Sequence, residues 1–398
     1  MKSHHGWAVG CLCLLFATPI SAAQEKSLPP ELSKEKASTK AKGMPSVELV
    51  MTAGMAHLVQ GQETIGKSEE KWEWPYEGVY RELGKIPLGY RVGGTSICAW
   101  SLLESPAALK DDATQAAIER ALRFVLAALD QPSMQPGFAD TYDVRNWGTI
   151  YALNFLLRLE ALQAVPEVHQ PAVHKRISWL IATLQSDAIP QTGGWNYARR
   201  GGANAPAASS PFMTAPAILA LWQADAQEYP IDQAVVELAL KSLLAAKVDN
   251  GVYAYTSSGG LSKMPGTIGR SPAVEVVLGL AGLSSADDCR TSVVNFLEEW
   301  PELEKRRAKT GTHKGDYGIA PYYFYYAHYY AALAIESLPV AQRESLRKRF
   351  RERLFASMDL DSMTFNDRVF PRSSHFGTAM SLLSLQAQHL PQPAGPKN

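Results

Sequence analysis

The chain has 398 residues, of which 46% are hydrophobic, and its 39 Lys and Arg residues balance 39 Asp and Glu residues. A net charge of zero does not indicate nucleic acid or an anionic membrane surface as a partner. Most of the chain is one long globular stretch, which is large for a single domain unless that domain is a closed repeat.

The first residues are organised like an export signal. Lys2 lies in a short polar start, the apolar core runs from Trp7 to Ala17, and small residues around Ala23 offer a cleavage site. The core is shorter than the roughly 20 residues that a helix needs to span a bilayer. We therefore expect cleavage near Ala23, an exported (periplasmic or secreted) protein, and no integral membrane segment after cleavage.

The remaining chain divides by composition. Residues 24–44 are rich in Lys, Ser and Pro and predict a flexible arm, residues 45–390 predict the globular domain, and residues 391–398 predict a disordered tail. Two cysteines remain after signal cleavage, Cys98 and Cys289, each within an apolar helical pattern. Free cysteine commonly packs as a small hydrophobe, so we expect two free, buried thiols.

Apolar segments with a helical pattern recur at intervals of 52 to 65 residues, and leucine stands seven residues after every marker residue. The markers are Thr95, Thr149, Thr214, Ser271, Tyr326 and Thr378. Amphipathic segments alternate with these: Ser46–Gln60, Ala113–Asp130, Gln170–Gln185, Ile231–Ala246, Ala286–Trp300 and Val340–Ser357. Helices that are apolar all round are buried on every side. The alternation predicts an all-α fold, a closed (α/α)6 toroid of six inner and six outer helices.

A glycine followed by an aromatic residue, here called a hook, recurs in the turns that precede inner helices. The hooks are Gly137-Phe138, Gly193-Gly194-Trp195, Gly251-Val252-Tyr253 and Gly315-Asp316-Tyr317. Glycine permits a tight reversal of the chain, and we expect the aromatic ring to pack between helix pairs. The longest interval between markers, from Thr149 to Thr214, contains Trp195 and, after it, the Gly/Ala-rich segment 199–210, where we expect a functional insertion.

Two of the amphipathic segments carry a motif that resembles the QW motif of squalene-hopene cyclases. Arg120–Phe124 is followed by Gln131 and a Gly-aromatic turn, and Lys175–Trp179 is followed by Gln185 and a second such turn. The mature chain is similar to the terpenoid cyclase and protein prenyltransferase superfamily, which includes the prenyltransferase/squalene-oxidase repeat. The resemblance implies an α/α barrel.

The catalytic motifs of that superfamily are not matched. Residues 359–362 lack the last Asp of the Asp-x-Asp-Asp acid of the cyclases. The zinc ligands that the resemblance to prenyltransferases would imply are Asp287 or Asp288, Cys289 and His328, but the first three lie on a predicted outer helix. The Gly-Cys-Gly-Glu-Gln run of complement-like thioester domains is also absent. We expect no metal and no cofactor.

Cations, here called the rim cations, precede most of the predicted inner helices: Arg91, Arg145, Arg199, Arg200, Arg270, Lys314 and Arg372. In a toroid the inner helices begin at one rim, where their dipoles also favour anions. With His313, His375 and Asn146, these cations would bind carboxylate, sulfate or phosphate. Aspartates in the same loops could instead pair with the cations: Asp140, Asp143, Asp249, Asp316 and Asp367. The rim would then be a structural network.

The sequence gives weaker evidence for catalytic residues than for the rim cations. Glu275 lies within an apolar helical segment, and His328 on the neighbouring inner helix is its expected partner. With Tyr323 and Asp316, the pair could perform acid–base chemistry on a carbohydrate, although glycoside hydrolysis usually needs two carboxylates that flank the bond. The alternative for His328 is a core histidine whose hydrogen bonds are satisfied.

Three functions therefore stay open. The first is an exported binding or scaffold protein for a small-molecule, oligosaccharide or protein ligand, with an Arg-rich mouth and without the cyclase acid. The second is an enzyme that acts on an anionic or carbohydrate substrate, and the third is an active isoprenoid cyclase or prenyltransferase. A salt-bridged centre would support the first, polar side chains converging in an open pit the second, and a dry aromatic cavity the third.

Overall fold

The computed structural model describes residues 44–64, 71–105, 108–136, 144–196, 205–248 and 251–397. These residues contain twelve α-helices, three short 3-10 helices and one antiparallel pair of strands, β1 (Glu63–Thr64) and β2 (Lys71–Glu73). The 3-10 helices are η1 (Ala108–Lys110), η2 (Pro132–Met134) and η3 (Glu167–His169). No helix in this part of the chain is both long and apolar enough to span a membrane.

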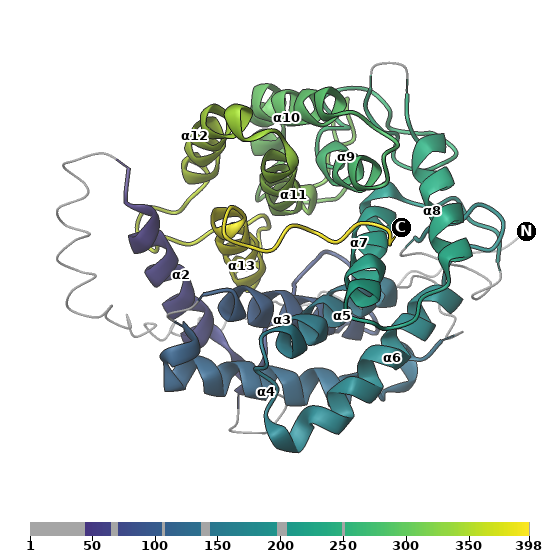
Figure 1. Ribbon diagram of the computed structural model, residues 1–398. Coiled ribbons are helices and arrows are strands. Elements are labelled where there is room, and N and C mark those ends of the chain that lie inside the picture. Colours follow the sequence, from purple (N-terminus) through teal and green to yellow (C-terminus); the bar gives the residue numbers. More distant parts are fainter. Residues whose placement is uncertain are drawn as a thin grey trace, which may run out of the picture. The chain divides into compact units, whose positions relative to one another are not determined.

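Six inner helices form a closed ring (Figure 1). They are α3 (Leu88–Leu103), α5 (Arg145–Ala161), α7 (Pro211–Ala226), α9 (Ser271–Leu280), α11 (Tyr323–Ser337) and α13 (Ser373–Gln386). Each contacts the next, and α13 contacts α3. All six leucines that follow the marker residues by seven positions are buried. The predicted closed toroid is confirmed.

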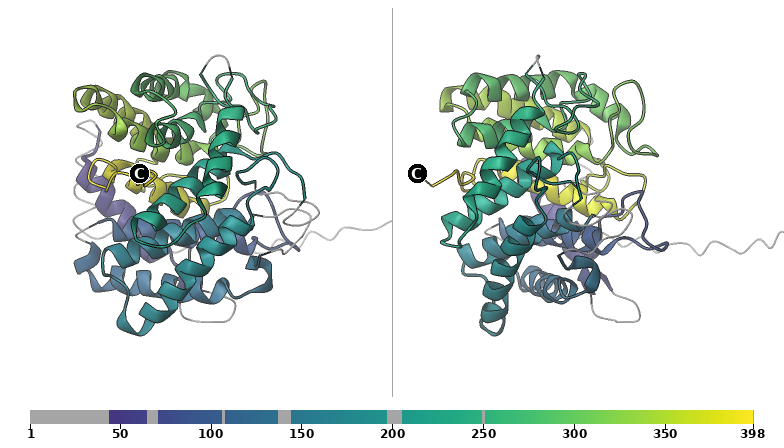
Figure 2. Two further views of the ribbon diagram at one scale, coloured as in Figure 1. Left: turned by 45° about the vertical axis from the view of Figure 1, so that its right-hand side comes forward. Right: turned by 90° about the vertical axis from the view of Figure 1, so that its right-hand side faces the viewer.

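Six outer helices surround this ring (Figure 2). They are α2 (Val47–Gly61), α4 (Asp112–Ala128), α6 (Gln170–Ser186), α8 (Gln233–Ala245), α10 (Ala286–Arg306) and α12 (Val340–Ala356). The first outer helix packs against the last inner helix, α13, so the two ends of the repeat meet. Helix α10 runs six residues beyond the predicted end at Trp300, because Lys305 and Arg306 suit a helix C-terminus.

The hook at Trp195 contacts the following inner helix through a hydrogen bond, and Trp74, which no glycine precedes, makes the same bond before α3. The backbone N–H of Trp195 donates to Thr214 Oγ1 at 3.0 Å, and that of Trp74 donates to Thr95 Oγ1 at the same distance. Each indole N–H also donates to a carbonyl of the preceding outer helix, α6 at 2.8 Å and α2 at 2.7 Å. Gly194 has a φ of 72°, which favours glycine. The hook at Trp195 is therefore structural.

The aromatic residues before the other inner helices differ in burial and in hydrogen bonding. Phe365, which the sequence pattern did not single out, donates its N–H to Thr378 Oγ1 at 3.1 Å, as the two tryptophans do. Tyr253 is fully buried, as predicted. Tyr317 is 39% exposed, so its ring does not fill the space between helix pairs. Phe138 lies outside the described residues.

Both cysteines are free and buried, as predicted. The segment predicted to be a disordered tail, residues 391–398, is described as far as Lys397 and contains no helix or strand. It nevertheless makes contacts, because Lys397 Nζ lies 3.5 Å from Asp225 Oδ1 and 3.4 Å from Glu228 Oε1. In Figure 1 the tail crosses one end of the barrel from α13 towards α7.

Candidate functional site

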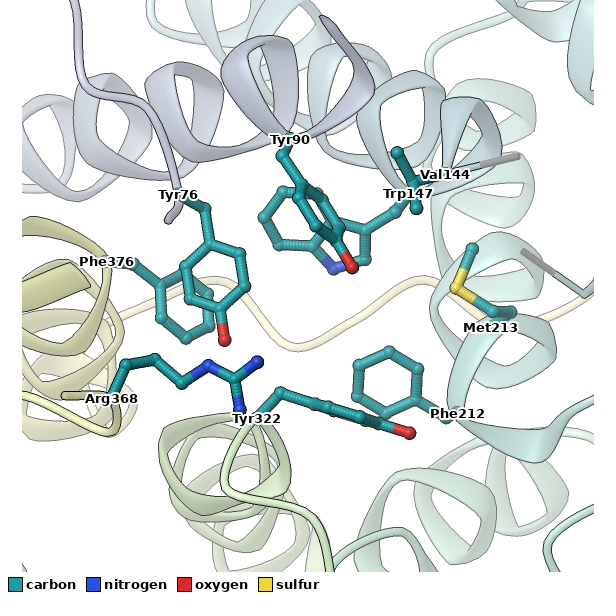
Figure 3. Close-up of a pocket in the computed structure, with 9 residues that line it drawn as sticks. All are labelled: Tyr76, Tyr90, Val144, Trp147, Phe212, Met213, Tyr322, Arg368 and Phe376. Atoms are coloured by element: carbon teal, nitrogen blue, oxygen red, sulfur yellow. The ribbon is translucent and has the colours of Figure 1, made fainter. Parts of the chain in front are cut away.

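A pocket opens where the inner helices begin, and the empty space in and in front of it, open solvent included, is about 450 Å3. We call it the mouth pocket (Figure 3). Its lining residues are Tyr76, Tyr90, Val144, Trp147, Phe212, Met213, Tyr322, Arg368 and Phe376. They come from the segment after β2, from the starts of α3, α5, α7, α11 and α13, and from the loop before α13. Sequence reasoning predicted a site at this end of the barrel but named none of these residues for it.

Aromatic rings form most of the pocket wall and contact one another. The ring of Tyr76 lies 4.6 Å from Phe376 and 5.6 Å from Trp147, measured between centroids. Across the pocket, Phe212 and Tyr322 lie 5.0 Å apart at an interplanar angle of 65°. Edge-to-face and tilted contacts of this kind are favourable for aromatic rings. The wall is therefore held in place before any ligand arrives.

Two consecutive glycines of α3 make room for this wall. A Cβ atom on Gly93 would lie 2.4 Å from the ring of Trp147, and one on Gly94 would lie 2.6 Å from the backbone nitrogen of Tyr76. Real Cβ atoms do not approach neighbours so closely. A side chain at either position would displace an aromatic residue of the pocket.

Arg368 is the one charged side chain among the residues that line the mouth pocket. It is only 4% exposed, and its Nε and Nη1 atoms have no hydrogen-bond partner. In Figure 3 its guanidinium group points into the space between Tyr76 and Tyr322. Because a buried cation without a hydrogen-bonding partner is costly, this side chain is suited to an anionic group of a ligand.

The neighbouring Asp367 is fully buried and connects to the pocket through a tyrosine. The hydroxyl of Tyr76 donates to its Oδ2 at 3.3 Å, and its Oδ1 has no hydrogen-bond partner. Burial raises the pKa of Asp367 to about 7, although the positive charge of Arg368 acts in the opposite direction. The charge behind the pocket therefore changes near neutral pH.

A second tyrosine of the pocket is linked to a histidine. The Nδ1–H of His313 donates to the carbonyl of Gly318 at 2.8 Å, so its Nε2 accepts from the hydroxyl of Tyr322 at 3.1 Å. Burial lowers the pKa of His313, which favours this neutral form. Of the three polar residues predicted to accompany the rim cations, His313 thus reaches the mouth pocket through Tyr322.

Two rim cations pair with carboxylates outside the mouth pocket. Arg91 donates two hydrogen bonds to Glu73, at 2.7 and 2.8 Å, and Arg372 lies 2.9 Å from Glu63. A third, Lys314, is exposed on a turn before α11. For Arg91 and Arg372 the structure shows the alternative of structural pairing.

Two further rim cations are buried and make ion-pair or hydrogen-bond contacts within the fold. The Nε of Arg145 lies 3.3 Å from Asp187 Oδ2, and both side chains are almost inaccessible. Arg270 donates to the backbone carbonyls of four residues in the loop before α9: Tyr253, Ala254, Leu261 and Gly266. Arg199 and Arg200 lie outside the described residues, as does the first half of the predicted insertion that contains them.

His375, predicted to bind an anion, lies on a different side of α13. Its ring centroid is 4.9 Å from that of His57 on α2, and it is 8% exposed. Burial lowers its pKa to about 3, so it is neutral at physiological pH. Asn146 is also buried, and its amide group donates to the carbonyl of Asn196 at 3.3 Å.

The predicted pairing of Glu275 with His328 does not occur. Glu275 faces a hook, where its Oε1 accepts from the hydroxyl of Tyr253 at 2.6 Å and lies 3.9 Å from Lys247 Nζ. Burial raises the pKa of Glu275. Asp316 lies on an exposed turn. Neither carboxylate belongs to the mouth pocket.

His328 is the core histidine of the alternative interpretation. Its Nδ1–H donates to the carbonyl of Phe324 at 2.7 Å, and its Nε2 accepts from the indole of Trp300 at 2.9 Å. Burial lowers its pKa to about 3. Tyr323 is buried beside the pocket, with its ring 5.3 Å from that of Phe212.

The residues that came nearest to the superfamily motifs do not form a centre. Asp359 and Asp361 lie on an exposed turn, and Asp288 caps the start of α10 through a reciprocal pair of hydrogen bonds with Ser285. Among the described residues, no cluster of three or more His, Cys, Asp or Glu side chains could hold a metal ion.

Comparison with known proteins supports the fold. No protein-family model and no curated protein matches the chain. Its structure is similar to the type II terpene cyclase MstE from Scytonema, with 13% identity over 86% of this chain and 98% of that chain and a TM-score of 0.51. The GH76A α-1,6-mannanase from Salegentibacter sp. HEL1_6 gives 13% identity over 85% and 98%, with a TM-score of 0.52. The Lin0763 protein from Listeria innocua gives 12% identity over 85% and 96%, with a TM-score of 0.54.

Proposed function

We propose that the protein binds, in the mouth pocket, a small ligand that joins an anionic group to a flat apolar body. The observation that carries this proposal is Arg368, a buried guanidinium group inside an aromatic wall whose Nε and Nη1 have no hydrogen-bond partner. Hydrogen bonds from a guanidinium to a carboxylate, sulfate or phosphate are about twice as strong as those between neutral groups. A bound anion would compensate the burial of this charge.

The wall determines the body of the ligand. Six of the nine lining residues are aromatic, and they present few polar atoms to the space between them. We infer an organic acid whose body is aromatic or a short isoprenoid rather than a multiply hydroxylated sugar.

Two structural neighbours have been solved with ligands of these two kinds, an aromatic isoprenoid compound and a sugar. The terpene cyclase has been solved with geranylgeranyl dihydroxybenzoate, described as its substrate, and the mannanase with α-1,6-mannotriose. An apolar chain on an aromatic ring matches the wall of the mouth pocket better than a neutral trisaccharide does. A second candidate function, an enzyme for anionic carbohydrate, is favoured by the hydrogen bond between Tyr322 and His313, which places a hydroxyl acceptor in the pocket.

Binding of acids to matched variants tests the proposal. We expect calorimetric titration with benzoate and 2-naphthoate to show binding, and the corresponding amides to bind far more weakly. Replacing Arg368 by Met is expected to weaken binding about 30-fold, because a hydrogen bond to a charged group contributes about 2 kcal/mol. Arg372→Met is the control, since Arg372 is 49% exposed and pairs with Glu63.

The outcomes separate the candidates. Equal binding by the Arg368→Met and Arg372→Met proteins would contradict the proposed anion site. Binding only of uronic-acid or sulfated oligosaccharides, with the release of new chain ends, would favour the carbohydrate enzyme. Conversion of an isoprenoid acid to a cyclic product would show the third function.

We also propose that the protein acts after export. The support is the sequence of residues 1–23 alone, which lie outside the described part of the chain. We expect the protein recovered from the periplasm or the culture medium to begin at or near Gln24, as determined by N-terminal sequencing. Recovery of the intact chain only in the cytoplasm would contradict export.

A further inference from the structure

A second pocket lies where the inner helices end, and the empty space in and around it, open solvent included, is about 710 Å3. We call it the far pocket. Its lining residues from the helices are Trp100, Glu104, Asn154, Arg158, Leu219, Gln223, Gln227, Tyr329, Tyr330 and Leu333. Trp100 and Tyr329 meet edge to face at 5.6 Å between ring centroids. The far pocket thus has an aromatic floor, and it is separate from the mouth pocket because the two share no residue.

The tail of the same chain forms the outer side of the far pocket. Leu390, Pro391 and Pro393 line it together with the aromatic residues. Figure 2 shows the C-terminus at one end of the barrel, and Figure 1 shows the tail passing across that end. Beyond the pocket, Gly395 reaches the end of α9 beside Leu280. The tail therefore spans the opening from α13 to α9.

The tip of the tail is held by charge. Lys397 lies between Asp225 and Glu228 at the end of α7, at 3.5 and 3.4 Å. Asp225 is buried and its Oδ2 has no hydrogen-bond partner, whereas Lys397 remains about half exposed. Exposed ion pairs contribute little, so this contact orients the tail more than it stabilises it.

The composition of the tail suits an exchangeable contact. Prolines at positions 391, 393 and 396 fix the backbone φ angle and remove N–H donors, so little conformational freedom is lost when the segment docks. Aromatic grooves that bind proline-rich segments use this property. Residues 393–395 are only half-buried, and Pro391 and Pro396 are exposed, so the tail is not part of the core.

We propose that the opening of the far pocket is a docking site for an extended proline-rich segment, and that the protein's own tail covers this opening reversibly. A partner would carry alternate prolines followed by a lysine that reaches Asp225 and Glu228. The site is independent of the mouth pocket, so failure of one proposal leaves the other untouched.

Truncation tests whether the site accepts a peptide in trans. A chain that ends at Leu390 is expected to bind a fluorescent peptide of residues 389–397, measured by anisotropy. The full chain is expected to bind it about tenfold more weakly, because its own tail competes. A peptide with Pro391→Ala and Pro393→Ala is the matched control and should lose most of the binding. Equal binding of both peptides, or none by a truncated chain that still unfolds cooperatively, would overturn the proposal.

A disulfide lock tests the same site in the full chain. A Cβ atom on Gly395 would lie 3.6 Å from Leu280 Cβ, within the separation of about 3.5–4.5 Å that a disulfide requires. The Leu280→Cys, Gly395→Cys protein should oxidise to one intramolecular bond, exclude the peptide, and bind it again at the full-chain level after reduction. Failure to form the bond, or peptide binding by the locked protein equal to that of the reduced one, would show that the tail does not cover the opening of the far pocket.

Discussion

Charge is buried in opposite ways at the two ends of the barrel. At the far pocket, Arg158 donates two hydrogen bonds to Glu104, at 2.6 and 2.9 Å, and Glu104 also accepts from the indole of Trp100 at 2.7 Å. At the mouth pocket, Arg368 has two unused donors, and the nearby Asp367 has a pKa near neutrality. The first arrangement is complete without a ligand, and the second is not.

Four of the rim cations have partners within the chain, as Arg158 does. Arg91, Arg145, Arg270 and Arg372 all have partners in the described chain, so counting cations near helix starts does not locate a ligand. Arg368 is buried like Arg145, but two of its guanidinium nitrogens, Nε and Nη1, have no hydrogen-bond partner, whereas Arg145 is paired with Asp187. A single unsatisfied charge is more informative about binding than a cluster of satisfied ones.

The largest expected effect contrasts the two arginines. Arg158→Met should lower the free energy of unfolding by about 4 kcal/mol, because it leaves the buried Glu104 without its cation. Arg368→Met should leave the stability of the ligand-free protein equal or higher, because it removes a buried charge without a hydrogen-bonding partner. Urea denaturation at pH 6 measures both. Similar losses in the two variants would remove the distinction between the ends.

The pH dependence of stability probes Asp367. Its folded pKa of about 7 lies above that of an unfolded aspartate, so its contribution is present at acid pH and is lost as pH rises through 7. Between pH 5 and pH 8 the loss should be roughly 3 kcal/mol at most, and Asp367→Asn should abolish that part of the slope. Denaturation midpoints across this range provide the measurement. An unchanged slope in the variant would mean that Asp367 titrates normally.

The aromatic wall is tested through the glycine beneath it. Gly93→Ala should destabilise the protein by about 2 kcal/mol and reduce benzoate binding, because the new methyl group meets the ring of Trp147. Gly279→Ala in α9 is the control, since its nearest neighbour would be 3.8 Å away. We expect that control to be neutral or slightly stabilising. Thermal unfolding and calorimetric titration compare the two, and equal effects would contradict a crowded wall.

The smallest effect concerns the hooks that position the mouth. Thr214→Val removes the oxygen that accepts from the N–H of Trp195 and should cost about 1 kcal/mol. Thr52→Val is a control, because the hydroxyl of Thr52 is exposed and bonds only within its own helix. Chemical denaturation resolves the difference. A loss as large for Thr52→Val as for Thr214→Val would argue against the hook bond.

Much of the fold was predictable because its signals are local. Every predicted inner and outer helix is present, since each pattern of apolar residues extends over ten residues or more. The hooks were predicted less well. Trp195 and Tyr253 are buried as expected, whereas Tyr317 is exposed and Trp74 and Phe365 were not recognised. The last two lack the preceding glycine that defined the pattern.

The sequence contains a pattern that indicates the mouth pocket but that was not used to predict it. Trp147, Phe212 and Phe376 each stand two residues before a threonine marker, and each lines the pocket. An aromatic residue at that position in three repeats indicates a ring at the start of an inner helix. Arg368, in contrast, has no periodic counterpart, and Arg372 was equally plausible as the cation before α13.

The sequence by itself determined the closed toroid, because helix periodicity and the spacing of repeats are properties of neighbouring residues. Only the tertiary structure determined which charged groups lack a partner. Glu73 and Glu63 neutralise Arg91 and Arg372 across segments that pack side by side, while no such group reaches the unused donors of Arg368. Whether a charge is satisfied depends on contacts between distant parts of the chain, and those contacts exist only after the ring has closed.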